Sequence, residues 1–87
     1  MKITAKFSAT DGTVTTATFD QESRTVVGQD GRRGTFTRAE GSNTIQIDGD
    51  ASLTITAKDP LQFVSGFTTS YTASNGKAGT VTIVSVE

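Results

Sequence analysis

Four Asx-Gly dipeptides recur along the chain and separate short runs rich in β-branched residues. They are Asp11-Gly12, Asp30-Gly31, Asp48-Gly49 and Asn75-Gly76. Glycine adopts positive φ angles at little steric cost, and Asx-Gly is the pair that tight hairpin turns favour. The threonine-rich runs between these dipeptides favour a pleated, half-buried sheet surface. The pattern therefore predicts an all-β chain whose strands are joined mostly by hairpins.

Apolar and polar residues alternate with a period of two in several windows, which is typical of strands with one solvent-facing side. The clear windows are residues 3–7, 45–47, 53–57 and 67–73, and weaker ones are residues 13–19, 24–27, 34–38 and 79–86. A chain of 87 residues has the size of one domain. We expect residues 1–87 to form a single small antiparallel barrel or sandwich of about eight short, hairpin-connected strands, and the pattern leaves barrel and sandwich open.

Three local irregularities refine this expectation. The alternation changes phase within residues 14–19 and 81–86, and a one-residue slip turns side chains to the other face of a sheet. We therefore expect β-bulges near residues 15–16 and 83–84, or, at the second place, a strand buried on both faces. Residues 58–66 contain the single proline followed by large apolar residues, which predicts a loop that crosses and plugs one end of the fold.

The composition excludes most catalytic chemistry. The chain has neither histidine nor cysteine, which removes Ser/His triads, thiolate metal sites and cysteine nucleophiles. Its acidic residues fall mainly in expected turns, where solvent leaves them unperturbed. Asp48-Gly49-Asp50 can offer two oxygen ligands to Ca²⁺ but lacks the EF-hand spacing and closing glutamate. We expect a protein that is not an enzyme and has no cofactor or metal.

Charge and hydropathy restrict the partners. Eight basic and nine acidic residues give a net charge of -1, which supplies no overall field to attract nucleic acid or an anionic membrane. The chain has no apolar run near the length that spans a bilayer, about 18 residues. We expect a soluble protein with neither a nucleic-acid nor a membrane partner, and its cellular compartment and oligomeric state remain open.

Arginines gather around one expected hairpin. Arg32 and Arg33 occupy its tip, and Arg24 and Arg38 lie on its two strands. If the four share one patch, they form a docking site for a carboxylate-rich or phosphate-bearing surface; the alternative is a solvated loop. Together with two apolar residues of the plugging loop they make up the expected partner-binding set. This set is Arg24, Arg32, Arg33, Arg38, Leu61 and Phe63.

Residues 66–83, with residues 52–56 before them, resemble the last hairpin and the preceding strand of bacterial and phage immunoglobulin-like modules. The likeness is compositional, and the Cys and Trp typical of antibody domains are missing. The resemblance implies a sandwich with an adhesive, spacer or virion-surface role and no catalytic residues.

The sequence thus favours a non-catalytic protein-binding module, a small inhibitor or accessory factor that acts through exposed loops. Two alternatives stay open. The first is a structural surface or virion module of the immunoglobulin-like kind. The second is a small-ligand-binding barrel, whose polar groups would come from Tyr71, Thr69 and Thr16.

Overall fold

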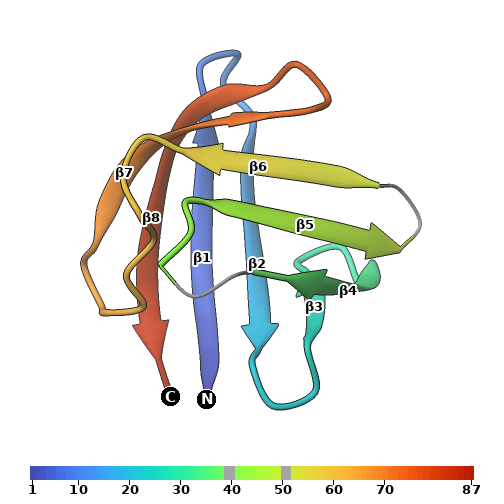
Figure 1. The fold of residues 1–87 in the computed structure, drawn as a ribbon. Coiled ribbons are helices and arrows are strands. Elements are labelled where there is room, and N and C mark those ends of the chain that lie inside the picture. The colour runs from blue at the N-terminus through green and yellow to red at the C-terminus, as the bar shows by residue number, and fades with distance from the viewer. Residues whose placement is uncertain (39–40, 50–51) are drawn as a thin grey trace.

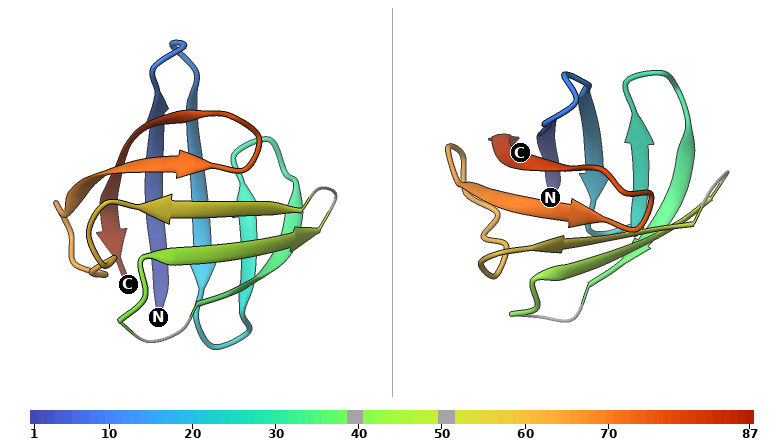
Figure 2. Two further views of the ribbon diagram at one scale, coloured as in Figure 1. Left: turned by 45° about the horizontal axis from the view of Figure 1, so that its top comes forward. Right: turned by 90° about the horizontal axis from the view of Figure 1, so that it is seen from above.

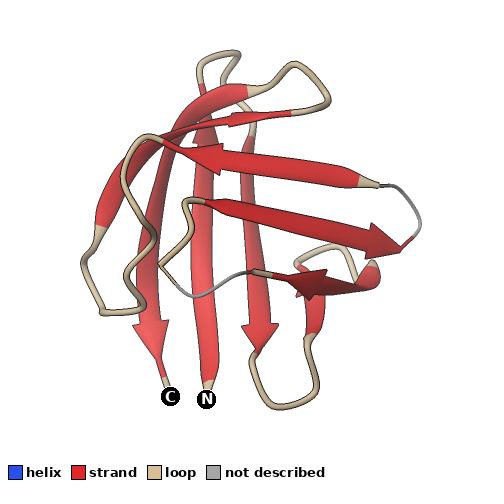
Figure 3. Cartoon of the chain, in the orientation of Figure 1, coloured by secondary structure: helices blue, strands red, loops and turns tan. Residues whose placement is uncertain are grey.

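In the residues that the structure describes, eight antiparallel strands close into one barrel (Figure 1). The computed structural model describes residues 1–38, 41–49 and 52–87. These residues contain no helix (Figure 3). The strands are β1 (Lys2–Ala9), β2 (Val14–Asp20), β3 (Thr25–Gly28), β4 (Arg33–Thr37), β5 (Thr44–Gly49), β6 (Leu53–Ala57), β7 (Thr68–Ala73) and β8 (Ala78–Val86).

Each strand pairs with its neighbours in the sequence, and β8 returns to pair with β1 (Figure 2). The expected all-β, hairpin-connected fold is confirmed, and of the two architectures left open the barrel is the one observed. Because the sheet closes on itself, every described strand has a hydrogen-bonded neighbour on both sides. The described strands therefore offer no free edge to a strand from another chain.

The register confirms one of the two expected bulges. Thr4 pairs with Ser85 but Ala5 pairs with Ile83, so Val84 is an extra residue in β8, with a side chain that is 50% exposed. The bulge expected near residues 15–16 is wrong, because β1 and β2 pair without a break from Lys2↔Asp20 to Ser8↔Val14. Val14 lies instead on the outer face of a regular strand, where a single exposed apolar side chain is ordinary.

Three of the four Asx-Gly dipeptides form turns in which the glycine has a positive φ, of 91° at Gly12, 87° at Gly31 and 88° at Gly76. The prediction of a turn at Asp48-Gly49 is wrong, because both residues belong to β5. Gly49 serves a different purpose: a Cβ at this position would lie 2.7 Å from the Arg33 carbonyl oxygen. The glycine lets β4 and β5 approach closely at this end of the barrel.

The core is built from inward side chains of all eight described strands. Every strand contributes at least one buried apolar side chain, and the β6–β7 loop adds another. These residues are Ile3, Ala5, Phe19, Val26, Phe36, Ile45, Ile55, Ala57, Leu61, Tyr71, Val81 and Ile83. Two edge-to-face aromatic pairs, Phe7 with Tyr71 and Phe19 with Phe36, have ring centroids 5.3 Å and 5.1 Å apart, a geometry that aromatic rings prefer.

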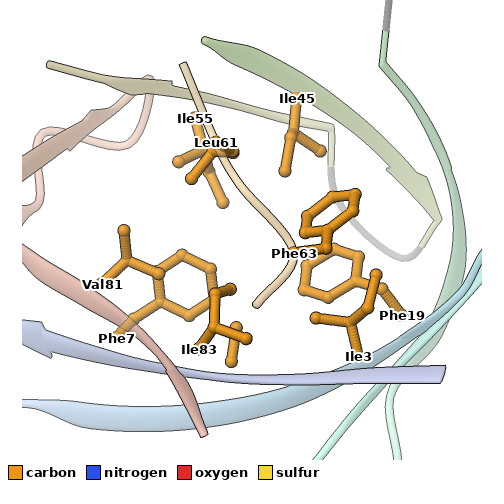
Figure 4. Close-up of a pocket in the computed structure, with 10 residues that line it drawn as sticks. Ile3, Phe7, Phe19, Ile45, Ile55, Leu61, Phe63, Val81 and Ile83 are labelled. Atoms are coloured by element: carbon orange, nitrogen blue, oxygen red, sulfur yellow. The ribbon is translucent and has the colours of Figure 1, made fainter. Parts of the chain in front are cut away.

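The β6–β7 loop plugs one end of the barrel, as the sequence indicates. Leu61 and Phe63 point from this loop into the interior (Figure 4), and the space left among the side chains there is only about 10 Å³. We call this the plugged end. It also carries the β2–β3 turn and both chain termini, while the β1–β2, β3–β4 and β7–β8 turns lie at the opposite end, which we call the open end (Figure 1).

Candidate functional site

The structure separates the four expected arginines into two pairs. Arg32 and Arg33 lie at the β3–β4 turn, where the Gly28 amide donates to the Arg32 carbonyl (2.8 Å). Arg24 and Arg38 flank the other ends of the same two strands. The expectation of one shared patch is wrong because four strand residues, about 13 Å of extended chain, lie between the tip and the base of this hairpin.

Arg38 is held in place at the plugged end by the β6–β7 loop. Its guanidinium carbon lies 4.7 Å from the centroid of the Phe63 ring, over which it stacks. Its Nη2 donates to the Leu61 carbonyl oxygen. Its Nε is buried and has no hydrogen-bond partner in the described part of the chain. The side chain is thus oriented by two contacts, and its Nε–H is a buried donor that none of the described residues accepts.

Arg24 joins Arg38 at a groove on the plugged end. The groove has a volume of about 340 Å³ and is lined by Gln21, Arg24, Phe36, Arg38 and Phe63. A second hollow of about 400 Å³ continues on the other side of the two arginines, toward Thr37, Ser42, Thr44 and Gln46. Two guanidinium groups and a half-buried aromatic ring therefore border one concave surface, which we call the Arg24/Arg38 groove.

The backbone at Arg24 is unusual for a residue with a long side chain. It has a φ of 57°, in the left-handed region that residues other than glycine, asparagine and aspartate seldom adopt. The Phe36 amide donates to the Arg24 carbonyl (3.0 Å) and ties this strained turn to β4. A glycine would adopt this φ with less steric strain than Arg24 does. Backbone strain of this kind is common at functional positions.

The two residues expected from the β6–β7 loop have different roles. Leu61 is only 5% exposed and packs in the core, so its side chain is not presented to a partner. Phe63 is partly exposed and lines both the core and the Arg24/Arg38 groove. Of these two residues, Phe63 is therefore the one whose side chain a partner can reach.

The open end holds a different arrangement. Arg32 pairs with Asp30 through Nε and Oδ2 (3.2 Å), whereas Arg33 is exposed. Below this rim lies a hollow of about 400 Å³ whose lining includes Ala17, Val26, Ile47 and Leu53. The sequence analysis did not identify this hollow. Its signal in the sequence is a set of very small residues at inward positions of neighbouring strands. They are Ala17, Gly28, Gly34 and Gly49.

The three polar residues proposed for a small-ligand site do not converge. Tyr71 lines a smaller hollow of about 160 Å³ at the open end, which adjoins the larger one and shares Ala17, Ile47 and Leu53 with it. Burial raises the pKa of the Tyr71 hydroxyl while the nearby Lys77 opposes this rise. Thr69 is buried and its Oγ1 donates to Asp59 Oδ2 (3.2 Å) beside the β6–β7 loop. Thr16 pairs with Lys6, one position out of phase with the inward Ala17. Only Tyr71 faces the hollow.

Acidic side chains are dispersed. Within the described ranges no three of them gather closely enough to hold a metal ion, and Asp50 of the Asp48-Gly49-Asp50 cluster lies outside the described residues. At the open end Asp11 accepts a hydrogen bond from Lys77 (2.7 Å). This bond, together with hydrogen bonds from Thr13, holds the pKa of Asp11 well below its usual range.

None of the elements in the described part of the chain is a helix of sufficient length and apolarity to cross a membrane.

No family model, curated protein or solved structure matches this chain. The resemblance to immunoglobulin-like modules therefore stays a prediction.

Proposed function

We propose that this chain is a non-catalytic protein-binding module that docks an acidic segment of its partner in the Arg24/Arg38 groove. The observation that carries the proposal is the fixed placement of Arg38 between Phe63 and the Leu61 carbonyl, with Arg24 on the same groove. A non-catalytic module that covers part of its partner's surface in this way would act as a small inhibitor or an accessory factor.

Arginine and aromatic side chains dominate the binding energy of many protein interfaces. A guanidinium presents a planar fork of donors that matches a carboxylate, and it stacks well on aromatic rings. Arg38 is already oriented before binding, so little side-chain entropy remains to be lost on association.

A protein partner suits this site better than a nucleic acid does. Proteins that bind a nucleic acid backbone commonly neutralise about six to ten phosphates, whereas this groove offers two arginines on a chain with a net charge of -1. The closed barrel also lacks a free edge among its described strands, which argues against binding by strand addition. The contacts with a protein partner would therefore be made by side chains at an end of the barrel.

The experiment compares two single charge reversals at opposite ends of the barrel. Wild type, Arg24→Glu and Arg33→Glu are used as immobilised baits for a lysate of the source cells, and the dissociation constant of each captured protein is then measured by calorimetry. Both arginines are exposed, so Arg33→Glu reproduces the charge change away from the groove. Thermal melts establish that both variants are folded.

We expect Arg24→Glu to weaken binding of the captured protein at least about tenfold, since a like charge then faces the acidic segment. Arg33→Glu should change the affinity less than about twofold. Equal effects of the two variants, an effect of Arg33→Glu alone, or a wild-type bait that retains nothing beyond the Arg24→Glu bait would contradict the proposal.

A further inference from the structure

The open end of the barrel contains an unfilled apolar space, separate from the Arg24/Arg38 groove. On β2 to β5 the inward positions near this end carry Ala17, Gly28, Gly34 and Gly49, and Ala17 lies opposite Gly28 while Gly34 lies opposite Gly49. Small barrels normally fill such positions with side chains. Ala17 contributes only a methyl group to this space and Gly28 contributes no side chain, whereas at Gly34 and Gly49 the backbone of the neighbouring strand already occupies the position that a Cβ would take.

Apolar side chains from other strands surround this space. Phe7, Ile47 and Leu53 are partly buried and pack against the core, and they line a hollow of about 160 Å³ together with Tyr71. An apolar cavity of about 150 Å³ in another protein is large enough to hold one benzene molecule. The hollow therefore matches a single aromatic ring or a short branched chain in size.

Tyr71 supplies a polar group to the hollow. It is only 6% exposed, yet none of the other described residues forms a hydrogen bond with its hydroxyl. The single sealed and unpaired polar side-chain atom among the described residues is Arg38 Nε, so the Tyr71 hydroxyl is not closed off in the core. Buried tyrosine hydroxyls usually have a partner, and the hollow is where one would lie.

The charge at the rim favours an uncharged ligand. Lys77, which also lines the hollow, is paired with Asp11 at 2.7 Å. Arg32 is paired with Asp30. Lys77, the one charged residue among the described residues that line the hollow of about 160 Å³, is thus compensated by a carboxylate, and the Tyr71 hydroxyl is left there as a neutral donor. Arg33 lines only the larger hollow beside it.

We propose that the open end binds a small uncharged aromatic molecule that carries one carbonyl oxygen, with the ring in the apolar hollow and the oxygen accepting from the Tyr71 hydroxyl. This inference does not depend on the proposed docking of a protein at the plugged end.

The test uses acetophenone as the probe, ethylbenzene as the shape-matched molecule without an acceptor, and benzoate as the anionic one. Each is titrated into ¹⁵N-labelled protein, and amide shifts give both the location and the dissociation constant. We expect acetophenone to shift amides around the hollow and to bind more tightly than benzoate. Two results overturn the proposal: no localised shifts with acetophenone, or benzoate as the tighter ligand.

Three variants separate the contributions of shape and hydrogen bonding. Thr15→Leu places a larger apolar side chain on the wall of the hollow, and Thr16→Leu is the matched control on the outer face of the same strand. Tyr71→Phe removes only the hydroxyl. Dispersed spectra of each variant show that it is folded.

Thr15→Leu should weaken acetophenone and ethylbenzene alike by at least about tenfold, while Thr16→Leu should leave both unchanged. Tyr71→Phe should weaken acetophenone about fivefold and leave ethylbenzene unaffected. An unchanged affinity in Thr15→Leu, or equal losses for the two ligands in Tyr71→Phe, would refute the proposed site or its hydrogen bond, respectively.

Discussion

Replacing Leu61 by alanine should destabilise the protein strongly, although Leu61 lies in a loop. The side chain is 5% exposed and fills the plugged end, where only about 10 Å³ remains free. Leucine-to-alanine changes in cores cost about 2–5 kcal/mol. A loop can relax more than a strand, so we expect a loss of about 2–3 kcal/mol in the free energy of unfolding.

This loss is large for a domain of 87 residues. At about 0.05–0.15 kcal/mol per residue, the whole domain has about 4–13 kcal/mol of stability, and the melting temperature should fall by about 10–20 °C. Urea unfolding followed by circular dichroism gives the free energy. The matched control is Val64→Ala in the same loop, where the side chain is 54% exposed and the change should stay within about 0.5 kcal/mol. Equal losses in Leu61→Ala and Val64→Ala would refute the plug.

Two further predictions concern the open end. Gly79→Ala should lower the unfolding free energy by about 1–3 kcal/mol in urea titrations, because the added Cβ would collide with the Ser8 carbonyl oxygen; a midpoint equal to that of wild type would contradict this close approach. Lys77→Met should raise the pKa of Asp11 toward about 3.9, since the hydrogen bond from Lys77 is the main cause of its lowered pKa. In wild type the Asp11 contribution to stability is present above pH about 3.9 and is lost as pH falls through the lower folded-state pKa. Side-chain NMR titration of both proteins measures this shift, and an identical Asp11 pKa in the two would count against it.

The strand pattern was predictable because each signal is local. Gly76 of the Asn75-Gly76 dipeptide has the positive φ that glycine favours in a tight turn, and the alternation on either side of this turn gives the right strands, β7 and β8. Asp48-Gly49 shows the limit of this reasoning: the same kind of dipeptide lies inside β5, where close contact with β4 decides its conformation. Backbone contact between strands is not encoded in the dipeptide itself.

The candidate sites were only partly predictable because they combine distant segments. Sequence adjacency placed Arg24 and Arg32 on one hairpin, but it gave no measure of the distance between the two ends of that hairpin. The contact of Arg38 with Phe63 joins segments that are 25 positions apart in the numbering, and they meet only because the β6–β7 loop folds over the plugged end. The hollow beside Tyr71 is lined by side chains from β1, β2, β5, β6 and β7, so no single segment of the sequence indicates it.

Mapping of the bound surface would test the central claim, that a protein partner is held at the plugged end, most directly. The captured partner is titrated into ¹⁵N-labelled protein, and amide shifts and line broadening are followed residue by residue. We expect the changes to cluster at Arg24, Arg38 and Phe63, with the open end unaffected. Changes confined to the β3–β4 turn at the open end, or spread along the outer faces of the strands, would contradict the account.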